Sequence, residues 1–257
     1  MEYEEHRERV RRAYAGVPAG TRVRLAKTTS NLFRARRSSS APRLDVDGLD
    51  RVLTVDPERR IADVGGMTTY EDLVDATLPH GLMPLVVPQL KTITLGGAVS
   101  GLGIESSSFR NGLPHESVLE MDVLTGDGRV VLARPGNEHG ALFHGFPNSY
   151  GTLGYALRLT IELEPVRPFV RLRHVRLDGR AACFAAMEEA CAQRSFAGER
   201  VDFVDGTVFG PRESYLTLGG YADGAPETSD YTGMDVYYRS LQRRREAAIS
   251  RWSQRTL

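Results

Sequence analysis

Glycine and hydroxyl side chains dominate the segment Thr92-Ile93-Thr94-Leu95-Gly96-Gly97-Ala98-Val99-Ser100-Gly101-Leu102-Gly103-Ile104-Glu105-Ser106-Ser107-Ser108. Four glycines fall within eight residues, and Glu105 is the nearest acid. A backbone with so few Cβ atoms can approach a ligand closely and can turn several N–H groups toward one anion. The composition therefore fits a phosphate-binding loop. It fits a structural turn equally well, so the flanking sequence has to decide.

The overall composition is that of an ordinary globular protein. The chain has 257 residues, 41% of them apolar and 26% charged, which suffices for one large domain or two modest ones. Its 33 basic residues balance 33 acidic residues. No global field therefore favours nucleic acid or anionic lipid, we expect no nucleic-acid partner, and any anion binding must be local.

Cysteine usage and the chain ends bear on cellular location. Cys183 and Cys191 are the only cysteines, and on a helix they would lie roughly 12 Å apart, beyond the reach of a disulfide. This favours a reducing compartment, and no Cys/His spacing predicts a metal site. The charged N-terminus lacks the apolar core of a signal peptide. Residues 243–257 predict either a frayed basic tail or a membrane-surface helix, so we expect a cytoplasmic protein with at most peripheral membrane contact.

Helix and strand patterns precede the glycine-rich segment. They predict a charged helix over 3–15 and short strands over 22–26, 52–55 and 61–64. Thr68 and Glu71 have the spacing of a capping box, which predicts a helix that stops before Gly81. Residues 82–89 contain two prolines and predict an extended connector into the glycine-rich segment.

Strand patterns return after the segment. Apolar runs over 118–124 and 129–133 flank Gly126-Asp127-Gly128, a strong hairpin pattern. Gly151-Thr152-Leu153-Gly154 then precedes a long strand predicted over 155–163. A structured ligand loop between these elements is favoured over a linker.

The pattern changes again after a predicted boundary at 165–168. It predicts a strand over 170–177, a helix over 181–193, and strands over 201–204 and 214–218. The helix is expected to bury a stripe that includes Phe184 and Ala190. This order begins an α+β unit that lacks its remaining elements.

Together these motifs resemble the PCMH-type FAD-binding domain of the vanillyl-alcohol oxidase superfamily. The form Gly-x-Gly-Ile-Glu-Ser-Ser-Ser at Gly101–Ser108 and the Tyr-Gly-Thr-Leu-Gly entrance at Tyr150–Gly154 resemble the 24-dehydrocholesterol reductase (delta-24 sterol reductase, diminuto-like) branch most. The likeness fades after residue 242, so the chain looks C-terminally shortened. The resemblance implies an α+β fold with four parts: an N-terminal helix (1–20), a two-subdomain FAD-binding domain (21–166), an incomplete α+β substrate domain (167–242) and the basic tail (243–257).

The resemblance also implies an FAD site made of two loops and one further glycine. The implied cofactor-binding residues are Thr28, Thr29, Ser30, Asn31, Thr94, Leu95, Gly96, Gly97, Ala98, Gly101, Gly103, Ile104, Glu105, Ser106 and Gly154. Such loops offer many donors to two phosphates without a lysine, although Lys27 and Lys91 flank them. Covalent members of the family attach the flavin through a histidine in the first loop. Residues 27–32 contain none, so we expect non-covalent FAD.

The function implied by the resemblance is flavin-dependent oxidoreduction of a carbon–carbon double bond in a small, apolar, sterol-like substrate. Hydride would pass through flavin N5, with NADPH as the candidate electron donor. Two alternatives stay open: an FAD-linked oxidase or dehydrogenase of an alcohol or sugar-derived substrate, and a truncated non-catalytic FAD-binding protein. The catalytic acid is not identified. Glu105 fits a cap better than an acid, His115 and Tyr150 are weaker candidates, and the oligomeric state is not predicted.

Overall fold

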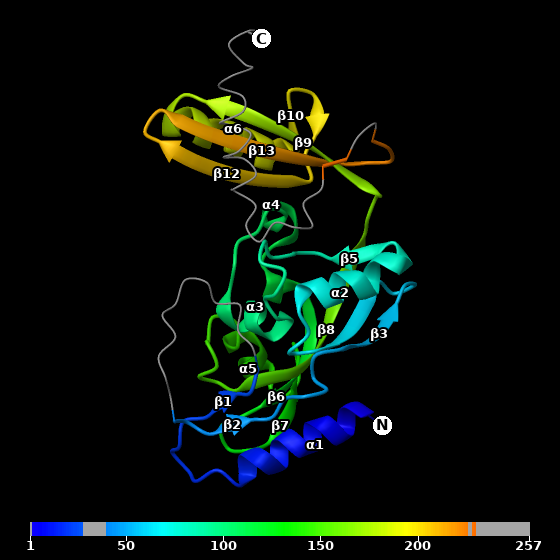
Figure 1. Ribbon diagram of the computed structural model, residues 1–257, viewed down its shortest axis with the longest axis vertical. Helices are drawn as coiled ribbons and strands as arrows, with labels where there is room; N and C mark the ends of the chain where they lie inside the picture. Colours follow the sequence, from blue (N-terminus) through cyan, green and yellow to red (C-terminus); the bar gives the residue numbers. More distant parts are fainter. Residues whose placement is uncertain (1, 28–39, 226–227, 230–257) are drawn as a thin grey trace. The chain divides into compact units, whose positions relative to one another are not determined.

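The computed structural model describes residues 2–27, 40–225 and 228–229 (Figure 1). The chain divides into two compact units, Met1–Val166 and Arg167–Leu257, which we call unit 1 and unit 2. Each is described by itself. Residues Thr28–Asn31 of the predicted first loop and residues 243–257 of the predicted tail lie outside the described part of the chain.

Unit 1 is organised around the long strand β8 (Tyr155–Pro165). The sheet has the order β3-β4-β8-β6-β7, with β5 also paired to β8, and all these pairings are antiparallel. The other strands are β3 (Val52–Asp56), β4 (Ile61–Gly65), β5 (Leu82–Pro84), β6 (Val118–Leu124) and β7 (Val130–Ala133), beside a separate parallel pair, β1 (Arg24–Leu25) and β2 (Arg43–Leu44). The predicted strand pair over 52–64 and the hairpin over 118–133 are confirmed.

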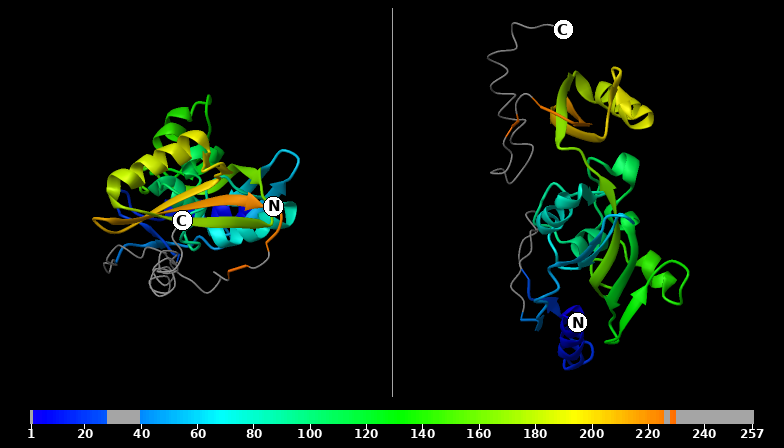
Figure 2. Two further views of the ribbon diagram at one scale, coloured as in Figure 1. Left: turned by 90° about the horizontal axis from the view of Figure 1, so that it is seen from above. Right: turned by 90° about the vertical axis from the view of Figure 1, so that its right-hand side faces the viewer.

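Helices cover both faces of this sheet. They are α1 (Glu2–Ala15), α2 (Tyr70–Thr77) with a 3-10 turn η1 (Leu78–His80), α3 (Leu95–Gly101), α4 (Ser108–Asn111), a 3-10 turn η2 (Pro114–Ser117) and α5 (Gly140–Gly145). In the right-hand view of Figure 2, α2 and α3 lie against one side of the sheet. The predicted stop of the second helix is confirmed, because Gly81 follows η1 with a left-handed φ of +68°.

The capping box was predicted one residue too early. Thr69, not Thr68, is the N-cap of α2, and its hydroxyl accepts the N–H of Asp72 at 3.1 Å. Glu71 instead pairs with Lys91 on the surface. Either threonine has an acid three residues later, so spacing alone could not choose between them.

Strand β8 separates an apolar face of the sheet from a mixed face. Leu159 and Ile161 are fully buried and belong to a core that includes Tyr70 and Leu73 of α2 and Val99 of α3. The alternate residues Arg158 and Thr160 point to the other face. There Val10 of α1 belongs to a second apolar cluster that includes Leu124 and Leu157.

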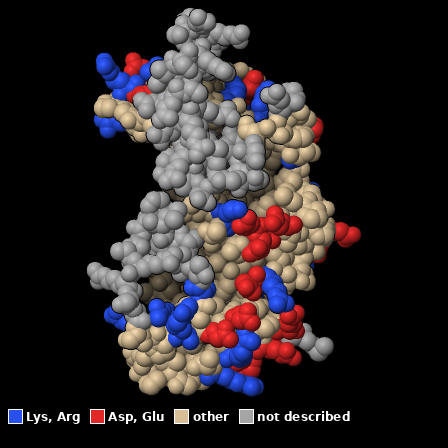
Figure 3. Space-filling view, in the orientation of Figure 1, with Lys and Arg blue, Asp and Glu red and all other residues tan. Residues whose placement is uncertain are grey.

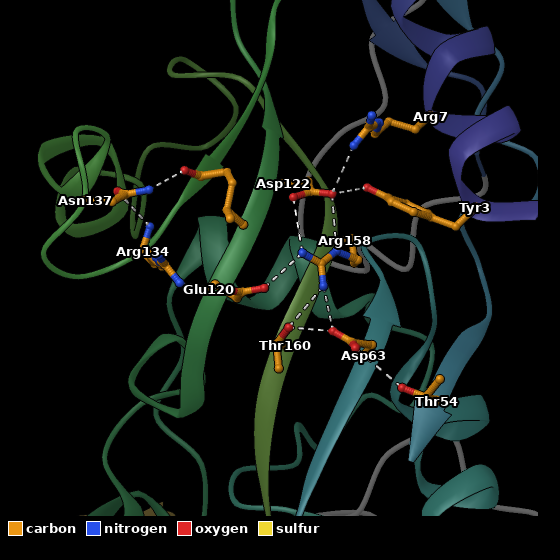
Figure 4. Close-up of polar contacts among 11 residues, drawn as sticks. Tyr3, Arg7, Thr54, Asp63, Glu120, Asp122, Arg134, Asn137, Arg158 and Thr160 are labelled. Carbon is orange, nitrogen blue, oxygen red and sulfur yellow. Dashed lines mark hydrogen bonds and ion pairs between the residues drawn. The ribbon is translucent and has the colours of Figure 1, made fainter. Parts of the chain in front are cut away.

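A charged network lies under the start of α1 (Figure 4). The guanidinium of Arg158 contacts Asp63 at 2.7 Å, Glu120 at 3.1 Å and Asp122 at 3.2 Å. Tyr3 of α1 donates its hydroxyl to Asp122 at 2.6 Å. Burial, and then this bond, raise the pKa of Tyr3. Burial works to lower the pKa of Arg158, but the facing carboxylates, Asp122 first, outweigh it and raise that pKa. One arginine therefore joins three strands and supports α1.

Unit 2 is a three-stranded antiparallel sheet with one helix. Its strand order is β12-β13-β9, formed by β9 (Phe169–Leu177), β12 (Phe203–Gly210) and β13 (Glu213–Ala222); the unit also contains α6 (Gly179–Gln193) and the short pair β10 (Ser195–Phe196) and β11 (Glu199–Arg200). Helix α6 buries Cys183, Ala186 and Ala190. The predicted stripe was wrong at Phe184, which is exposed. Both cysteines are free, and the idea that this unit is an incomplete domain stays a prediction.

Replacing Arg158 with methionine should destabilise unit 1. The change leaves the carboxylates of Asp63, Glu120 and Asp122 without their shared cation, and the side chain of Asp122 is only 8% exposed. We expect a loss of about 2–3 kcal/mol in unfolding free energy, below the value for a fully buried pair because Arg158 keeps some solvent contact. Urea unfolding monitored by circular dichroism measures it. The control is Arg129→Met, whose partner Asp127 lies in an exposed turn; equal midpoints for the two variants would contradict the assignment.

Candidate functional site

The glycine-rich segment folds as a short helix followed by a loop. Thr94 is the N-cap of α3, and its Oγ1 accepts the N–H of Gly97 at 3.3 Å. Leu95 and Val99 lie one turn apart and are both buried in the core. The expectation of a continuous loop was therefore wrong in its first half. Capping by Thr94 and burial of one face offset the poor helix propensity of the glycines.

Backbone groups of three segments meet without intervening side chains at the start of α3. Gly66 donates its N–H to Leu157 O at 2.8 Å, and its own carbonyl accepts the N–H of Gly96 at 2.9 Å. A Cβ on Gly66 would lie 2.0 Å from Ala156 O, and one on Gly96 would lie 2.7 Å from Gly66 O. These two glycines are accounted for by packing.

The first N–H groups of α3 already have partners inside the protein. Leu95 N donates to Thr68 O and Ala98 N to Thr94 O, both at 2.9 Å, alongside the bonds of Gly96 and Gly97 described above. The N–H groups of Gly103 and Ile104, after the helix, make no hydrogen bond among the described residues. The open donors of the segment therefore lie in its second half, whereas composition alone placed them throughout.

Lys27 brings a positive charge to the N-cap of α3. Its Nζ donates to Thr94 Oγ1 at 2.6 Å, and burial lowers the pKa of this ammonium group. No described carboxylate forms an ion pair with it, and no acid occurs in the sequence between Arg22 and Leu44. Lys91 differs, because it pairs with Glu71. Lys27 is thus a half-buried cation whose counter-charge is not among the described residues.

Side-chain bonds fix the loop after α3 to the connector that precedes it. Ser107 Oγ donates to Leu85 O at 2.9 Å, and Asn111 donates to the same carbonyl at 2.6 Å. Glu105 Oε2 accepts the N–H of Gln89 at 3.2 Å. Glu105, expected beside a ligand, thus has a structural partner and acts as an anchor, and Ser107, two residues later in the loop, does the same.

A buried ion pair secures the end of this loop. Arg110 binds Glu164 of β8 through two bonds, at 2.6 and 2.7 Å. The two side chains are only 10% and 14% exposed. Strand β8 therefore contacts the segment near both of its ends, through Gly66 at one end and through Arg110 at the other.

Tyr150 lies beside the C-terminal end of α3. Its N–H donates to Ser100 O at 3.0 Å, and its ring atom Cε1 lies 3.9 Å from the position that a Cβ on Gly101 would occupy. Ile104, the third residue after the helix, is 85% exposed. This contact joins residues fifty positions apart, so the sequence showed the two motifs but not that they meet.

The remaining predicted residues fall into two groups. Leu95 and Ala98 point into the core, and Gly154 is a packing position, because its φ is +131° and a Cβ there would lie 2.3 Å from Leu124 O. The residues with accessible surface are Gly97, Gly101, Gly103, Ile104 and Ser106. Nδ1 of His115 is buried and has no hydrogen-bond partner among the described residues.

The sequence of this chain matches the family model described as FAD binding domain over residues 4–134, about half of its length. The chain belongs to this FAD-binding domain family. The match extends from α1 to β7 and includes Lys27, the Gly66–Gly96 contact and the whole of α3. The predicted resemblance is thereby confirmed at the level of the family.

Individual relatives show which proteins of known name the chain resembles. It is 31% identical to Delta(24)-sterol reductase of Pisum sativum over 184 residues, 70% of this chain and 32% of that protein. With Delta(24)-sterol reductase of Homo sapiens it shares 30% identity over 198 residues, 76% of this chain and 35% of the relative. Cytokinin dehydrogenase 10 of Oryza sativa subsp. japonica is 32% identical over 157 residues, 61% and 28% of the two chains. The chain thus spans about a third of the length of these relatives.

Three further findings concern the described residues. On the face of unit 1 that Figure 3 shows, acidic and basic side chains lie intermixed. No described helix has both the length and the apolar character needed to cross a membrane. Among the same residues, no group of three or more His, Cys, Asp or Glu side chains is placed to hold a metal ion.

Adjacent glycines of α3 should respond differently to alanine. In Gly96→Ala the new Cβ meets the Gly66 backbone, which cannot move without breaking its bond to β8, so we expect a loss of about 2–3 kcal/mol in unfolding free energy. In Gly97→Ala the Cβ meets only Thr94 Oγ1, at 2.9 Å. The weakened cap then opposes the gain in helix propensity, so the unfolding free energy should change by less than about 1 kcal/mol. Urea denaturation of both variants measures this, and equal losses would refute the packing role of Gly96.

Proposed function

We propose that this chain binds FAD non-covalently and serves in a flavin-dependent oxidoreductase. The observation that carries the proposal is Lys27, an ammonium group held on the N-cap of α3 with no carboxylate partner in the described part of the chain. A phosphate of FAD would supply the missing negative charge. Thr94 holds Lys27 in place, and Gly97 leaves the neighbouring surface without a side chain.

The second half of the segment suits the flavin ring. Gly103 and Ile104 present N–H groups with no partner among the described residues, and a flavin carries hydrogen-bond acceptors along one edge. The missing side chains at Gly101 and Gly103 would let a flat ring approach the backbone. The predicted loop Thr28–Asn31 would complete the phosphate site and stays part of the proposal.

The substrate class that we propose is a small, apolar, sterol-like alkene. Support comes from the relatives named Delta(24)-sterol reductase and from the exposed apolar side chains of Leu102 and Ile104 beside the open donors. Bound FAD would supply hydride chemistry at N5. Overall, the alkene would gain a hydride originating from NADPH and a proton from solvent, yielding the saturated product and NADP⁺.

A second candidate is an FAD-linked dehydrogenase of another substrate class. The similarity to a cytokinin dehydrogenase supports it. Because the chain spans about a third of its relatives, a third candidate is FAD binding without turnover by this chain alone. All three candidates share the FAD site and differ in the compounds that reduce or oxidise the bound flavin.

Replacing Lys27 with methionine should weaken FAD binding about tenfold, the effect of losing one charge-assisted contact to phosphate. Lys91→Met is the matched control, because Lys91 pairs with Glu71 and should leave affinity unchanged. Since burial lowers the pKa of Lys27, wild-type affinity should also fall more steeply than that of Lys27→Met as alkaline pH removes the charge. Fluorescence titration with FAD measures both effects, and acid precipitation should release all flavin.

Bleaching of the flavin absorbance distinguishes the three candidates. A sterol reductase should bleach anaerobically with NADPH and regain its colour with a sterol alkene. A dehydrogenase of another class should instead bleach with an alcohol or sugar-derived substrate and not with NADPH. A yellow chain that no donor bleaches would support FAD binding alone, and a chain that takes up no FAD would refute the proposal.

A further inference from the structure

Tyr150 lies in a turn whose backbone is costly for its sequence. Asn148 has a φ of +60°, Tyr150 of +49° and Gly151 of +82°. A left-handed conformation costs a residue such as tyrosine about 1 kcal/mol or more relative to glycine. Bonds from Tyr150 N to Ser100 O and from Thr152 N to Ser149 O, at 3.0 and 2.9 Å, hold the turn in place.

Burial of the side chain does not account for this cost. Tyr150 remains 56% exposed, and its ring lies beside Gly101. Leu102 and Ile104, one and three residues after Gly101, are 37% and 85% exposed. The surface next to the ring therefore combines exposed apolar side chains with the open N–H groups of Gly103 and Ile104.

This combination fits a flat heteroaromatic ring. Such a ring packs its face against an aromatic side chain, while acceptor atoms on its edge accept hydrogen bonds from backbone N–H groups. Phosphate fits this end of α3 poorly, since the C-terminal end of a helix carries partial negative charge. Lys27 lies at the opposite end, about 10 Å away for seven residues of helix. Within FAD, the phosphates would lie toward Lys27 and a ring toward Tyr150.

We propose that Tyr150 is a cofactor-contacting residue that packs against the isoalloxazine ring of FAD. The inference rests on the proposed function, because it requires the chain to bind FAD. It gives a role to an exposed ring on a left-handed backbone. It also explains why the ring must lie over a glycine: a side chain at position 101 would occupy the space where the two rings meet.

Flavin fluorescence tests the contact without relying on turnover. A phenol ring in contact with an excited flavin quenches it, so wild-type protein should bind FAD with strongly reduced fluorescence. In Tyr150→Leu, bound FAD should be brighter and bind about five- to tenfold more weakly, as expected for one aromatic contact. Tyr150→Phe should retain most of the affinity and lose most of the quenching, since phenylalanine is a far weaker electron donor.

Two glycine variants separate the contact from backbone strain. Tyr150→Gly and Arg60→Gly both relieve a left-handed residue, since Arg60 has a φ of +54° in the turn between β3 and β4. Both should leave the melting temperature of the apoprotein within about 3 °C of wild type or above it. Only Tyr150→Gly should weaken FAD binding and restore flavin fluorescence.

The outcomes distinguish the inference from the proposed function. If wild type binds FAD and Tyr150→Leu keeps both its affinity and its quenching, this inference is overturned and the proposed function stands. In competition titrations, Tyr150→Leu could weaken the binding of ADP and leave the binding of riboflavin unchanged. Tyr150 would then contact the adenine, and the inference is again overturned. A wild-type chain that binds no FAD would overturn both.

Discussion

The structure of unit 1 depends on a place where three backbone segments touch with no side chains between them. Gly66 lies between Leu157 of β8 and Gly96 of α3, and its N–H and carbonyl are bonded to one segment each. Any Cβ at Gly66 would overlap Ala156 O. The contact fixes where α3 begins relative to the sheet. The positions of Thr94, Lys27 and the residues after α3 follow from it.

Local sequence patterns were sufficient for the strands that combine apolar runs with turn residues at their ends. The strands at 52–64, the hairpin at 118–133 and the long strand β8 follow from apolar runs bounded by turn residues. Helix α3 was missed because three of its seven residues are glycine, which local propensity treats as a breaker. Its stability comes from Thr94 and from the buried side chains of Leu95 and Val99, which are tertiary effects.

Composition singled out the candidate functional segment, but it did not indicate the role of each residue. Glycines look alike in a sequence, yet Gly96 and Gly154 are required by backbone contacts, whereas Gly97 and Gly103 leave surface open. Likewise, Ser107 and Glu105 resemble ligand donors and in fact bind the connector at Leu85 and Gln89. These distinctions depend on partners far away in the chain, as do the meeting of Lys27 with Thr94 and of Tyr150 with Gly101.

The length of strand β8 fixes the distance between the two places where α3 and α4 are attached to the sheet. Leu157 binds Gly66, which binds the start of α3, and Glu164 binds Arg110 of α4, so the number of residues between Leu157 and Glu164 sets the distance between these two attachments. One inserted residue would turn every following side chain to the opposite face and would place Glu164 away from Arg110. The hairpin turn at Gly126 is held differently, by a hydrogen bond from the Tyr14 hydroxyl of α1 to the Gly126 carbonyl at 2.9 Å. An insertion at this turn would break that bond and leave the length of β8 unchanged.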